Sequence, residues 1–390
     1  MDAMCTSQIS PASDAATNHT NIQTAFGNAQ KGNVICLHGG TYSLQDELDL
    51  SVDNVEIRSM TDGQAILDFK GQQHGANGLL ITGNGDKVNN VTVKNTPGDA
   101  IRANQVTGIT FLNVTVTWDG GADTSNGAYG LYPVQSTHVL IDGCKVSYAS
   151  DAGIYVGQSS QVLIRNSEAF GNVAGIEFEN TTDAEGVNNY SHDNTGGILI
   201  FNLPNLMMQG GARTNLHNNR IDSNNGMNFA AKSSIVHNVP SGTGVLVMAA
   251  ANNEVHDNMI TNNGSTALAV VSYLLLQMCY MDPNYYPYPT GNYLHDNQFS
   301  GNGQYPSGLA NTLAAAIGDK TITDLVWDGM VDPQKPLDMN TTNCFHANGS
   351  ATFTNLNAAV NNMCTLTGLM ASTDVSKYDC MHAPLPSITP

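Results

Sequence analysis

A short hydrophobic pattern recurs along most of the chain: a small residue, an aliphatic residue and then a variable residue. The copies lie about 22 residues apart, and two of the intervals, of 30 and 47 residues, leave room for loop insertions. They are Ala100-Ile101-Arg102, Gly130-Leu131-Tyr132, Gly153-Ile154-Tyr155, Gly175-Ile176-Glu177, Gly197-Ile198-Leu199, Gly244-Val245-Leu246 and Ala267-Leu268-Ala269. Such a repeat indicates one structural unit stacked on itself.

A second apolar pattern follows these starts by about ten residues. Its copies are Val93-Lys94-Asn95, Phe111-Leu112-Asn113, Ile141-Asp142-Gly143, Ile164-Arg165-Asn166, Val187-Asn188-Asn189, Leu216-His217-Asn218, Val255-His256-Asp257 and Leu294-His295-Asp296. Short alternating strands with Asn, Gly and Asp at the corners, and no room for a crossover helix, predict a solenoid of β coils. A leucine-rich repeat has a similar period, but its consensus Leu and Asn spacing is missing. The pattern therefore favours an all-β, right-handed parallel β-helix.

The two ends of an open solenoid expose strand edges that must be covered. Residues 20–45 predict an amphipathic helix, with Ile22, Phe26 and Ala29 on one side, followed by an apolar strand and a Gly-Gly turn. From about residue 308 the period is lost. We therefore predict an N-terminal segment and cap at 1–45, a parallel β-helix at 46–307 and a C-terminal capping region at 308–390.

Charge is scarce and strongly acidic. Of 390 residues only 12% are charged, about half the usual share, so runs of Asn, Ser, Thr and Gly are expected to cover the surface. With 14 basic and 33 acidic residues the net charge is −19, which argues against nucleic acid as a partner. The same charge opposes a polyanionic glycan, unless a cation such as Ca²⁺ bridges carboxylates on both sides.

The apolar and cysteine residues bear on localisation. The longest apolar run, 268–279, is interrupted and much shorter than the roughly 20 residues that span a bilayer, so no membrane span is predicted. Cys144 follows a strand-like run and is predicted to be a small buried hydrophobe. The other cysteines near the ends fit one or two disulfides in an oxidising compartment: Cys5, Cys36, Cys344, Cys364 and Cys380. We expect a secreted, periplasmic or cell-surface protein.

Alternation within the first strands defines an outward strip. If Leu131, Ile154 and their equivalents point inward, their successors point outward, and coils about 4.8 Å apart stack these successors into columns. One column contains Arg102, Tyr132, Tyr155, Glu177, Leu199 and Leu246; the other, two residues on, contains Asn104, Val134, Gly157, Glu179, Phe201 and Met248. The strip is polar and aromatic over the early coils and apolar over the later ones.

The polar part of this strip carries the candidate chemistry. A tyrosine hydroxyl, a carboxylate and a cation within a few coils suffice for proton abstraction beside a carboxylate, or for acid–base glycoside chemistry. The candidate catalytic residues are Tyr129, Tyr132, Asp151, Tyr155 and Glu177, and the candidate substrate-binding residues are Arg102, Glu179, Phe201, Lys232, Leu246 and Met248. The alternative is an ordinary solvent-facing sheet, although such a gathering of charge is unexpected in so uncharged a chain.

Three insertions interrupt the later coils, at residues 202–211, 226–243 and 272–291, and they are rich in Met, Tyr and Pro. Long loops in a compact repeat are often functional, and these are expected to wall the apolar half of the strip. Arg102 or Lys232 would neutralise a substrate carboxylate. Alternatively, their methionines pack the loops down as small cores.

His217, His256 and His295 occupy one position of the second strand in three coils. Imidazoles spaced by one coil could share a transition metal such as Zn²⁺ or Cu²⁺. The alternative is a surface stack, because a straight ladder gives poor tetrahedral geometry. The carbohydrate hypotheses require no cofactor.

The cap stretch QTAFGNAQKGNVICLHGGTYSL and coils such as DAGIYVGQSSQVLIRNSEAFGN resemble bacterial secreted parallel β-helix repeat proteins. This group includes mannuronan C5-epimerases and alginate lyases, and the resemblance covers residues 20 to about 305. In the epimerases the motif is Tyr-Gly, an aromatic or aliphatic residue, then Asp-Pro-His, with Tyr, Asp and His catalytic. Here Tyr129, Gly130 and Pro133 match, whereas Tyr132 stands at the Asp position and Val134 at the His position. The resemblance thus implies a role for Tyr129, with Tyr132, Asp151 or Glu177 as its partner.

Three hypotheses follow. The first is a carbohydrate-active protein that acts on a polysaccharide, uronate-containing or neutral, by lyase or epimerase chemistry. The second is a non-catalytic polysaccharide-binding or surface protein that uses the same strip. The third is a metal-binding protein centred on the histidine column.

Overall fold

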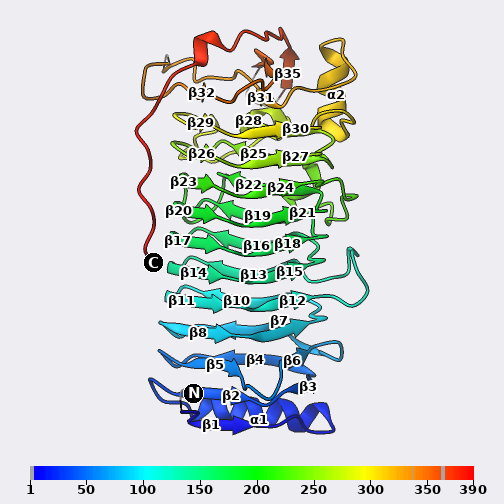
Figure 1. Ribbon diagram of the computed structural model, residues 1–390, viewed down its shortest axis with the longest axis vertical. Helices are drawn as coiled ribbons and strands as arrows, with labels where there is room; N and C mark the ends of the chain where they lie inside the picture. Colours follow the sequence, from blue (N-terminus) through cyan, green and yellow to red (C-terminus); the bar gives the residue numbers. More distant parts are fainter. Residues whose placement is uncertain (1–3, 336, 362–364) are drawn as a thin grey trace.

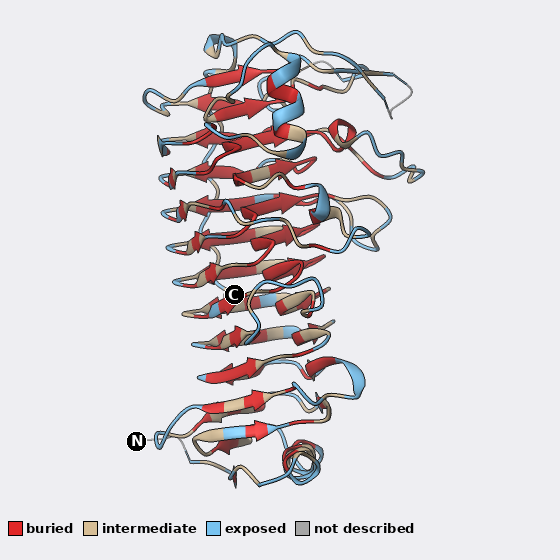
Figure 2. Ribbon diagram, turned by 90° about the vertical axis from the view of Figure 1, so that its right-hand side faces the viewer, coloured by how far each residue is buried: buried red, intermediate tan, exposed pale blue. Residues whose placement is uncertain are grey.

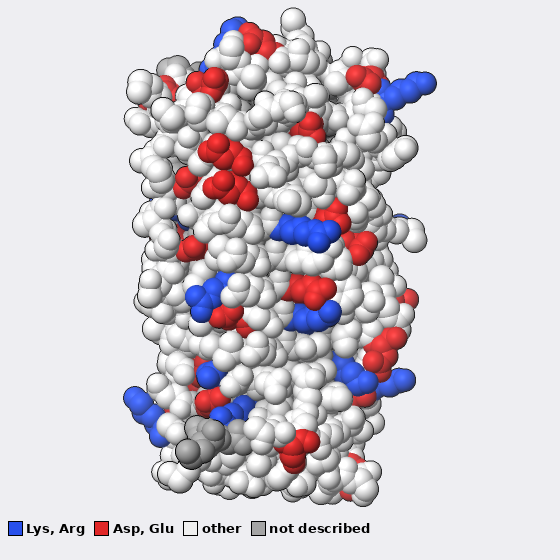
Figure 3. Space-filling view, viewed as in Figure 1, with Lys and Arg blue, Asp and Glu red and all other residues white. Residues whose placement is uncertain are grey.

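The computed structural model describes residues 4–335, 337–361 and 365–390. The chain winds into a parallel β-solenoid of about 13 turns, so that strands far apart in the sequence lie on top of one another (Figure 1). No helix among the described residues is long and apolar enough to cross a membrane. On the face shown in Figure 3, charged side chains form scattered groups on a largely uncharged surface.

Three parallel sheets run along the solenoid axis, and their strands follow one another around each regular coil. Sheet I comprises β4 (Asp46–Leu50), β7 (His74–Ile81), β10 (Asp99–Asn104), β13 (Tyr129–Val134), β16 (Ala152–Gly157), β19 (Ala174–Glu179), β22 (Gly196–Phe201), β25 (Thr243–Met248), β28 (Thr266–Val271), β31 (Leu325–Trp327) and β33 (Phe353–Asn355).

Sheet II comprises β1 (Ser7–Ile9), β2 (Val34–Leu37), β5 (Glu56–Ser59), β8 (Asp86–Asn89), β11 (Thr107–Leu112), β14 (Thr137–Asp142), β17 (Ser160–Arg165), β20 (Thr182–Val187), β23 (Ala212–His217), β26 (Glu254–His256), β29 (Tyr293–His295) and β32 (Cys344–His346). Sheet III comprises β3 (Gly40–Ser43), β6 (Ala65–Asp68), β9 (Val91–Lys94), β12 (Thr115–Thr117), β15 (Lys145–Ser147), β18 (Glu168–Phe170), β21 (Tyr190–His192), β24 (Arg220–Asp222), β27 (Met259–Thr261) and β30 (Gln298–Ser300).

The third strand of each coil is the main addition to the predicted pattern, which had two. Its strands are only three or four residues long, too short to show alternation in the sequence. Val93, assigned to the second-strand series, lies in β9 of sheet III. Val187 pairs with His217 rather than with Leu216, whose partner in β20 is Gly186; the predicted register was therefore wrong by one residue at this coil.

The interior is built from stacked identical positions. Leu131, Ile154, Ile176 and Ile198 pair in register and are buried. At the corners, buried asparagines form ladders in which each side-chain amide donates to the next; Asn189, Asn219, Asn258 and Asn297 make one of these. Much of the asparagine that we expected on the surface thus satisfies buried polar groups instead.

The first coil is covered by α1 (Ala15–Gly27), which buries Ile22 and Phe26 against it. The other end carries α2 (Gly308–Ala316), the antiparallel pair β34 (Ala359–Asn361) and β35 (Thr365–Gly368), and η3 (Ser376–Tyr378). Disulfides join Cys5 to Cys36 and Cys344 to Cys380, whereas Cys364 lies outside the described residues. Cys144 is buried, as predicted. Parallel pairing continues past residue 307 to β33, so the domain division stays a prediction.

Candidate active site

The register of sheet I builds the outward strip. Tyr132 lies beside Arg102, Tyr155 beside Glu177, and Glu179 beside Phe201. Because their inward neighbours fill the core, these side chains point away from the solenoid interior. Residues up to 146 positions apart, from Arg102 to Met248, thereby share one wall.

This wall is not an open surface over the later coils. The loops that follow β22, β24 and β28, the last two containing η1 (Ile235–Asn238) and η2 (Tyr273–Leu276), pack over it in a second hydrophobic cluster. Phe201 and Met248 are each only 1% exposed, and Leu246 is partly buried. The loops thus cover Phe201 and Met248, and a role for these two residues in substrate binding stays a prediction. Figure 2 shows these loops standing out beside the stacked, buried strands.

An apolar pocket of about 70 Å³ remains beneath the loops. Its lining includes Phe201, Leu246, Met248, Leu275 and Leu313. The insertions therefore form small cores as well as walls, through residues such as Val236, Tyr273 and Leu275. The alternative interpretation that their methionines fill these cores was wrong, because Met207, Met208, Met278 and Met281 are exposed.

Next to this covered region lies a tyrosine–carboxylate cluster, comprising Tyr129, Tyr132, Asp151, Tyr155, Glu177 and Glu179. The ring centroid of Tyr129 lies 4.5 Å from those of Tyr132 and Tyr155, which are 5.0 Å from each other. The Tyr155 hydroxyl donates a hydrogen bond of 2.7 Å to Glu179 Oε1. The structure thus brings together all five of the predicted catalytic residues.

Burial disfavours ionisation of the carboxyl groups in this cluster. It raises the pKa of Asp151 to about 6 and that of Glu179 to about 7. The pKa of Glu177 is raised well above its usual value by burial, and also by repulsion from Asp151 and Glu179. Glu177 is 1% exposed, and its Oε2 has no hydrogen-bond partner among the described residues. Near neutral pH the cluster therefore holds exchangeable protons.

The pKa values of the tyrosines in the cluster are raised as well. Burial and the neighbouring carboxylates raise the pKa of both Tyr129 and Tyr155 well above the ordinary tyrosine value. Both hydroxyls are therefore proton donors at neutral pH. A protonated donor and a carboxylate that accepts from it constitute an acid–base pair.

The accessible end of the cluster faces the earlier coils. Tyr129, Tyr132 and Arg102 are only partly buried. The Arg102 guanidinium carbon lies 5.0 Å from the Tyr132 ring centroid, and its Nη2 donates to Asn104 Oδ1. Arg102 thus places a cation at the partly exposed side of the cluster.

Two further residues belong to the site but were not predicted. Burial raises the pKa of Asp99 to about 6, opposed by Arg102; it precedes the first repeat start directly, and that position could have identified it. Ser234, on the loop before β25, donates a hydrogen bond of 2.5 Å to Asp151 Oδ2. Nothing in the sequence signals a contact across 83 positions.

Lys232 has different surroundings from Arg102. It is exposed and lines a surface pocket of about 240 Å³ together with Asn205, Ser234 and Tyr273. None of the six cluster residues lines that pocket, but Ser234, which donates to Asp151, does.

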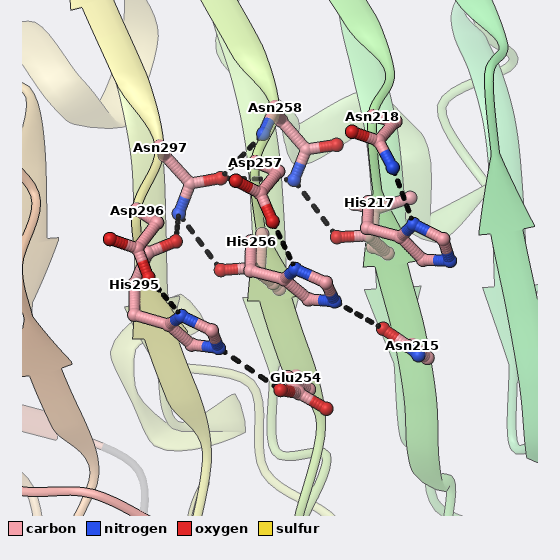
Figure 4. A network of polar contacts seen from close by, with 12 residues as sticks. Asn215, His217, Asn218, Glu254, His256, Asp257, Asn258, His295, Asp296 and Asn297 are labelled. Carbon is pink, nitrogen blue, oxygen red and sulfur yellow. Dashed lines mark hydrogen bonds and ion pairs between the residues drawn. The ribbon is translucent and has the colours of Figure 1, made fainter. Parts of the chain in front are cut away.

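The histidine column forms a parallel stack on sheet II, shown in Figure 4. Ring centroids are 4.9 Å apart, with interplanar angles of 7° and 1°. The Nε2 atoms of His217, His256 and His295 lie 3.0–3.1 Å from Glu185 Oε1, Asn215 Oδ1 and Glu254 Oε1, and the Nδ1 atoms face Asn218, Asp257 and Asp296. His346 extends the column by one coil.

This geometry does not fit a shared metal ion. Nitrogen lone pairs lie in the ring plane, so parallel rings direct them side by side rather than to a common point. In the described parts of the chain no group of three or more His, Cys, Asp or Glu side chains is arranged to hold a metal. Each imidazole nitrogen already has a polar neighbour.

Comparison with known proteins identifies the class. A sequence profile for the right handed beta helix region matches residues 77–239 and 137–274. The chain therefore belongs to this family, and the solenoid is a right-handed parallel β-helix, as the repeat predicts. A comparison with curated protein sequences gave no match.

Solved structures share the fold. One is the A-module of the mannuronan C-5 epimerase AlgE4 from Azotobacter vinelandii, with a TM-score of 0.54 and 16% identity over 82% of this chain and 88% of that one. Another is the AlgE6 A-module from the same organism, with a TM-score of 0.52 and 15% identity over 74% and 83%. A third is the family 28 exopolygalacturonase of Yersinia enterocolitica, with a TM-score of 0.50 and 12% identity over 84% and 67%. At these identities the likeness establishes the fold alone.

Proposed function

We propose that this protein acts on a polysaccharide and that the tyrosine–carboxylate cluster is its acid–base centre. The observation that carries the proposal is the Tyr155–Glu179 hydrogen bond beside Glu177, whose buried Oε2 has no partner among the described residues. Groups this costly to bury are typical of functional sites. The neighbours named as mannuronan epimerases and an exopolygalacturonase support a polysaccharide as the substrate class.

The arrangement suits chemistry at a sugar that carries a carboxylate. Arg102 at the partly exposed side would neutralise that group, and Asp151 or Glu177, when ionised, would take the proton from the carbon that bears it. The Tyr129 hydroxyl would supply a proton. Its delivery to the opposite face of that carbon inverts the centre, whereas its delivery to the departing oxygen substituent on the next carbon gives β-elimination. Because burial raises the pKa of Asp151 to about 6 and that of Glu179 to about 7, part of the cluster's carboxyl groups stays protonated at pH 6–7. The cluster therefore repels a uronate less than its composition suggests.

We also propose that the protein works outside the reducing cytoplasm. Disulfides join Cys5 to Cys36 and Cys344 to Cys380, one near each end of the solenoid. Such bonds persist in oxidising compartments.

A panel of polysaccharides tests this function. Incubation with polyuronates should give new absorbance near 235 nm for elimination or altered uronate NMR signals for epimerisation, and neutral glycans should be assayed for new reducing ends. Turnover by the protein and its loss in Glu179→Gln would support the proposal. Absence of all three signals across the panel would contradict it.

A second candidate is a non-catalytic polysaccharide-binding protein. The observation that favours it is the burial of Glu177 and Phe201, each 1% exposed. In that case glycan binding would occur without turnover, would be lost in Arg102→Ala or Tyr132→Ala, and would be unchanged in Glu179→Gln. Binding measured by affinity electrophoresis alongside the turnover assays separates the two candidates.

A further inference from the structure

Residues 381–390 form an extended strap along the outside of sheet II. Figure 1 shows it running down the solenoid beside β29, β26, β23 and β20, across the strand direction. Its upper end is fixed by the Cys344–Cys380 disulfide and by His382, whose Nε2 lies 2.7 Å from the Thr342 carbonyl oxygen. Below that point most strap residues are exposed.

Two glutamates of sheet II hold the free part of the strap. The backbone N–H of Leu385 donates to Glu254 Oε2, and that of Ile388 donates to Glu185 Oε2, each at 2.6 Å. In both glutamates the other oxygen, Oε1, lies 3.0 Å from a histidine Nε2, of His295 and His217 respectively. With the strap in place, Glu254 and Glu185 are only 3% and 5% exposed.

The spacing of these acceptors matches the strap conformation. Glu254 and Glu185 are two coils apart, with Asn215 between them, which corresponds to about 9.6 Å. Leu385 and Ile388 are three residues apart, and three residues of polyproline II rise about 9.3 Å. Pro384, Pro386 and Pro390 favour this conformation and have no N–H of their own.

The glutamates are built to receive backbone donors. The histidines fix one oxygen of each carboxylate, so the second oxygen is oriented outward. A segment that covers this oxygen displaces water from it and must supply a donor, because a buried carboxylate oxygen without one is costly. The strap supplies those donors through few contacts, and a pocket of about 190 Å³ remains between it and the sheet near Glu254, Tyr293 and Ala383. A segment held by so few contacts can be displaced by another peptide that offers the same donors.

We propose that the outer face of sheet II across β20, β23 and β26 is a binding site for an extended proline-rich peptide, occupied in this chain by its own residues 383–390. The recognised features are two backbone N–H groups three residues apart in a polyproline II segment. This site is on a different sheet from the tyrosine–carboxylate cluster, and the proposal does not depend on the proposed function.

The test uses a chain that ends at His382, which keeps the Cys344–Cys380 disulfide and the His382 contact. A fluorescein-labelled peptide APLPSITP, the sequence of residues 383–390, is titrated with the truncated and the full-length protein, and anisotropy is measured. We expect saturable binding to the truncated chain that is at least tenfold tighter than to the full-length protein, where the strap competes.

Peptide variants test the donors. N-methylation at the positions of Leu385 and Ile388 removes both N–H groups and should weaken binding at least tenfold, whereas N-methylation at Ser387 should leave it within about twofold. On the protein side, Glu185→Gln with Glu254→Gln should weaken binding, and Glu56→Gln, on β5 of the same sheet, should not. Equal binding of all peptides, equal binding to both chains, or no binding at millimolar protein would overturn the proposal.

A measurement on the full-length protein covers the case in which the truncated chain does not fold. Amide hydrogen exchange at Leu385 and Ile388 should be slow relative to Ser387, and Glu254→Gln should accelerate exchange at Leu385. Exchange at the free-peptide rate at both positions would contradict the proposal.

Discussion

Two columns of stacked side chains lie on different sheets of this molecule and differ in how their polar groups are satisfied. In the histidine column on sheet II each ring nitrogen of His217, His256 and His295 has a polar neighbour. In the cluster on sheet I, Glu177 has a buried oxygen without a partner among the described residues, and its carboxyl group is repelled by Asp151 and Glu179.

The same repeat therefore produces two outcomes. Stacking alone aligns identical positions every coil, and it does so equally for a structural ladder and for a reactive site. The two columns differ in their contribution to stability. Buried groups that are unsatisfied or repel one another lower the free energy of unfolding, and they persist where they serve function. Both columns were candidates from the sequence, and only the tyrosine–carboxylate cluster combines burial with an unpaired oxygen on Glu177 among the described residues.

The largest expected effect is on turnover. Glu179→Gln keeps the size of the side chain but removes its acid–base capacity, so kcat on a polysaccharide identified by the panel should fall at least about 100-fold. His256→Gln, in the satisfied column, is the matched control and should retain activity within about twofold. Equal losses in both variants would remove the distinction between the columns.

The second effect is on stability as a function of pH. The folded-state pKa of Glu179 is about 7 and that of Asp151 about 6, both above their ordinary values of 4.5 and 3.8. The folded state therefore binds more protons than the unfolded state in this range, and stability falls as pH rises from about 4 to 8.

Glu179→Gln should remove part of this dependence. Relative to the unsubstituted protein it should gain up to about 3 kcal/mol of unfolding free energy at pH 8 and little at pH 4, measured by urea denaturation. The gap should vanish at low pH because Glu179 is then protonated in both states. A difference of the same size at both pH values would contradict the assignment.

A smaller stability effect is expected in the histidine column. His295→Ala leaves the buried Glu254 Oε1 without its neighbour and should lower the unfolding free energy by about 1–3 kcal/mol. His256→Ala, whose Nε2 faces the neutral Asn215, should cost less. Thermal and urea unfolding measure both, and turnover should be unchanged; a loss of activity in either variant would assign this column a functional role.

The smallest effect concerns the loop contact. Ser234→Ala removes the hydrogen bond that lowers the pKa of Asp151, so that pKa should rise further. The limb of the pH–rate profile that reports Asp151 should move to higher pH, with roughly a three- to tenfold loss of rate near pH 6. Ser233→Ala, on the same loop, is the control. An unshifted profile would show that Asp151 does not act in turnover.

Much of the fold follows from the sequence because each coil repeats the same local requirement. The small-aliphatic repeat predicts that Leu131 and Ile154 point inward. Alternation along the strand then places their successors, Tyr132 and Tyr155, on the outer face. The short strands of sheet III carry too few residues for alternation to be visible.

The site was predictable only where it lies on the repeat. Tyr155 and Glu177 lie at equivalent positions of adjacent coils, so the repeat period predicts that they are neighbours. Ser234 reaches Asp151 from an irregular loop, and the burial of Phe201 depends on how that loop and its neighbours pack. No local pattern encodes either contact, because both arise from packing between distant segments.

The disulfides have a consequence for how the molecule comes apart. A solenoid whose rungs contact only their neighbours unravels by fraying inward from its termini. Here Cys5 is tied to Cys36 beside the first rungs, and Cys344 to Cys380 beside the last. When both disulfides are formed, the end coils cannot fray independently, whereas after reduction they can. The redox state of the surroundings therefore determines where unfolding begins.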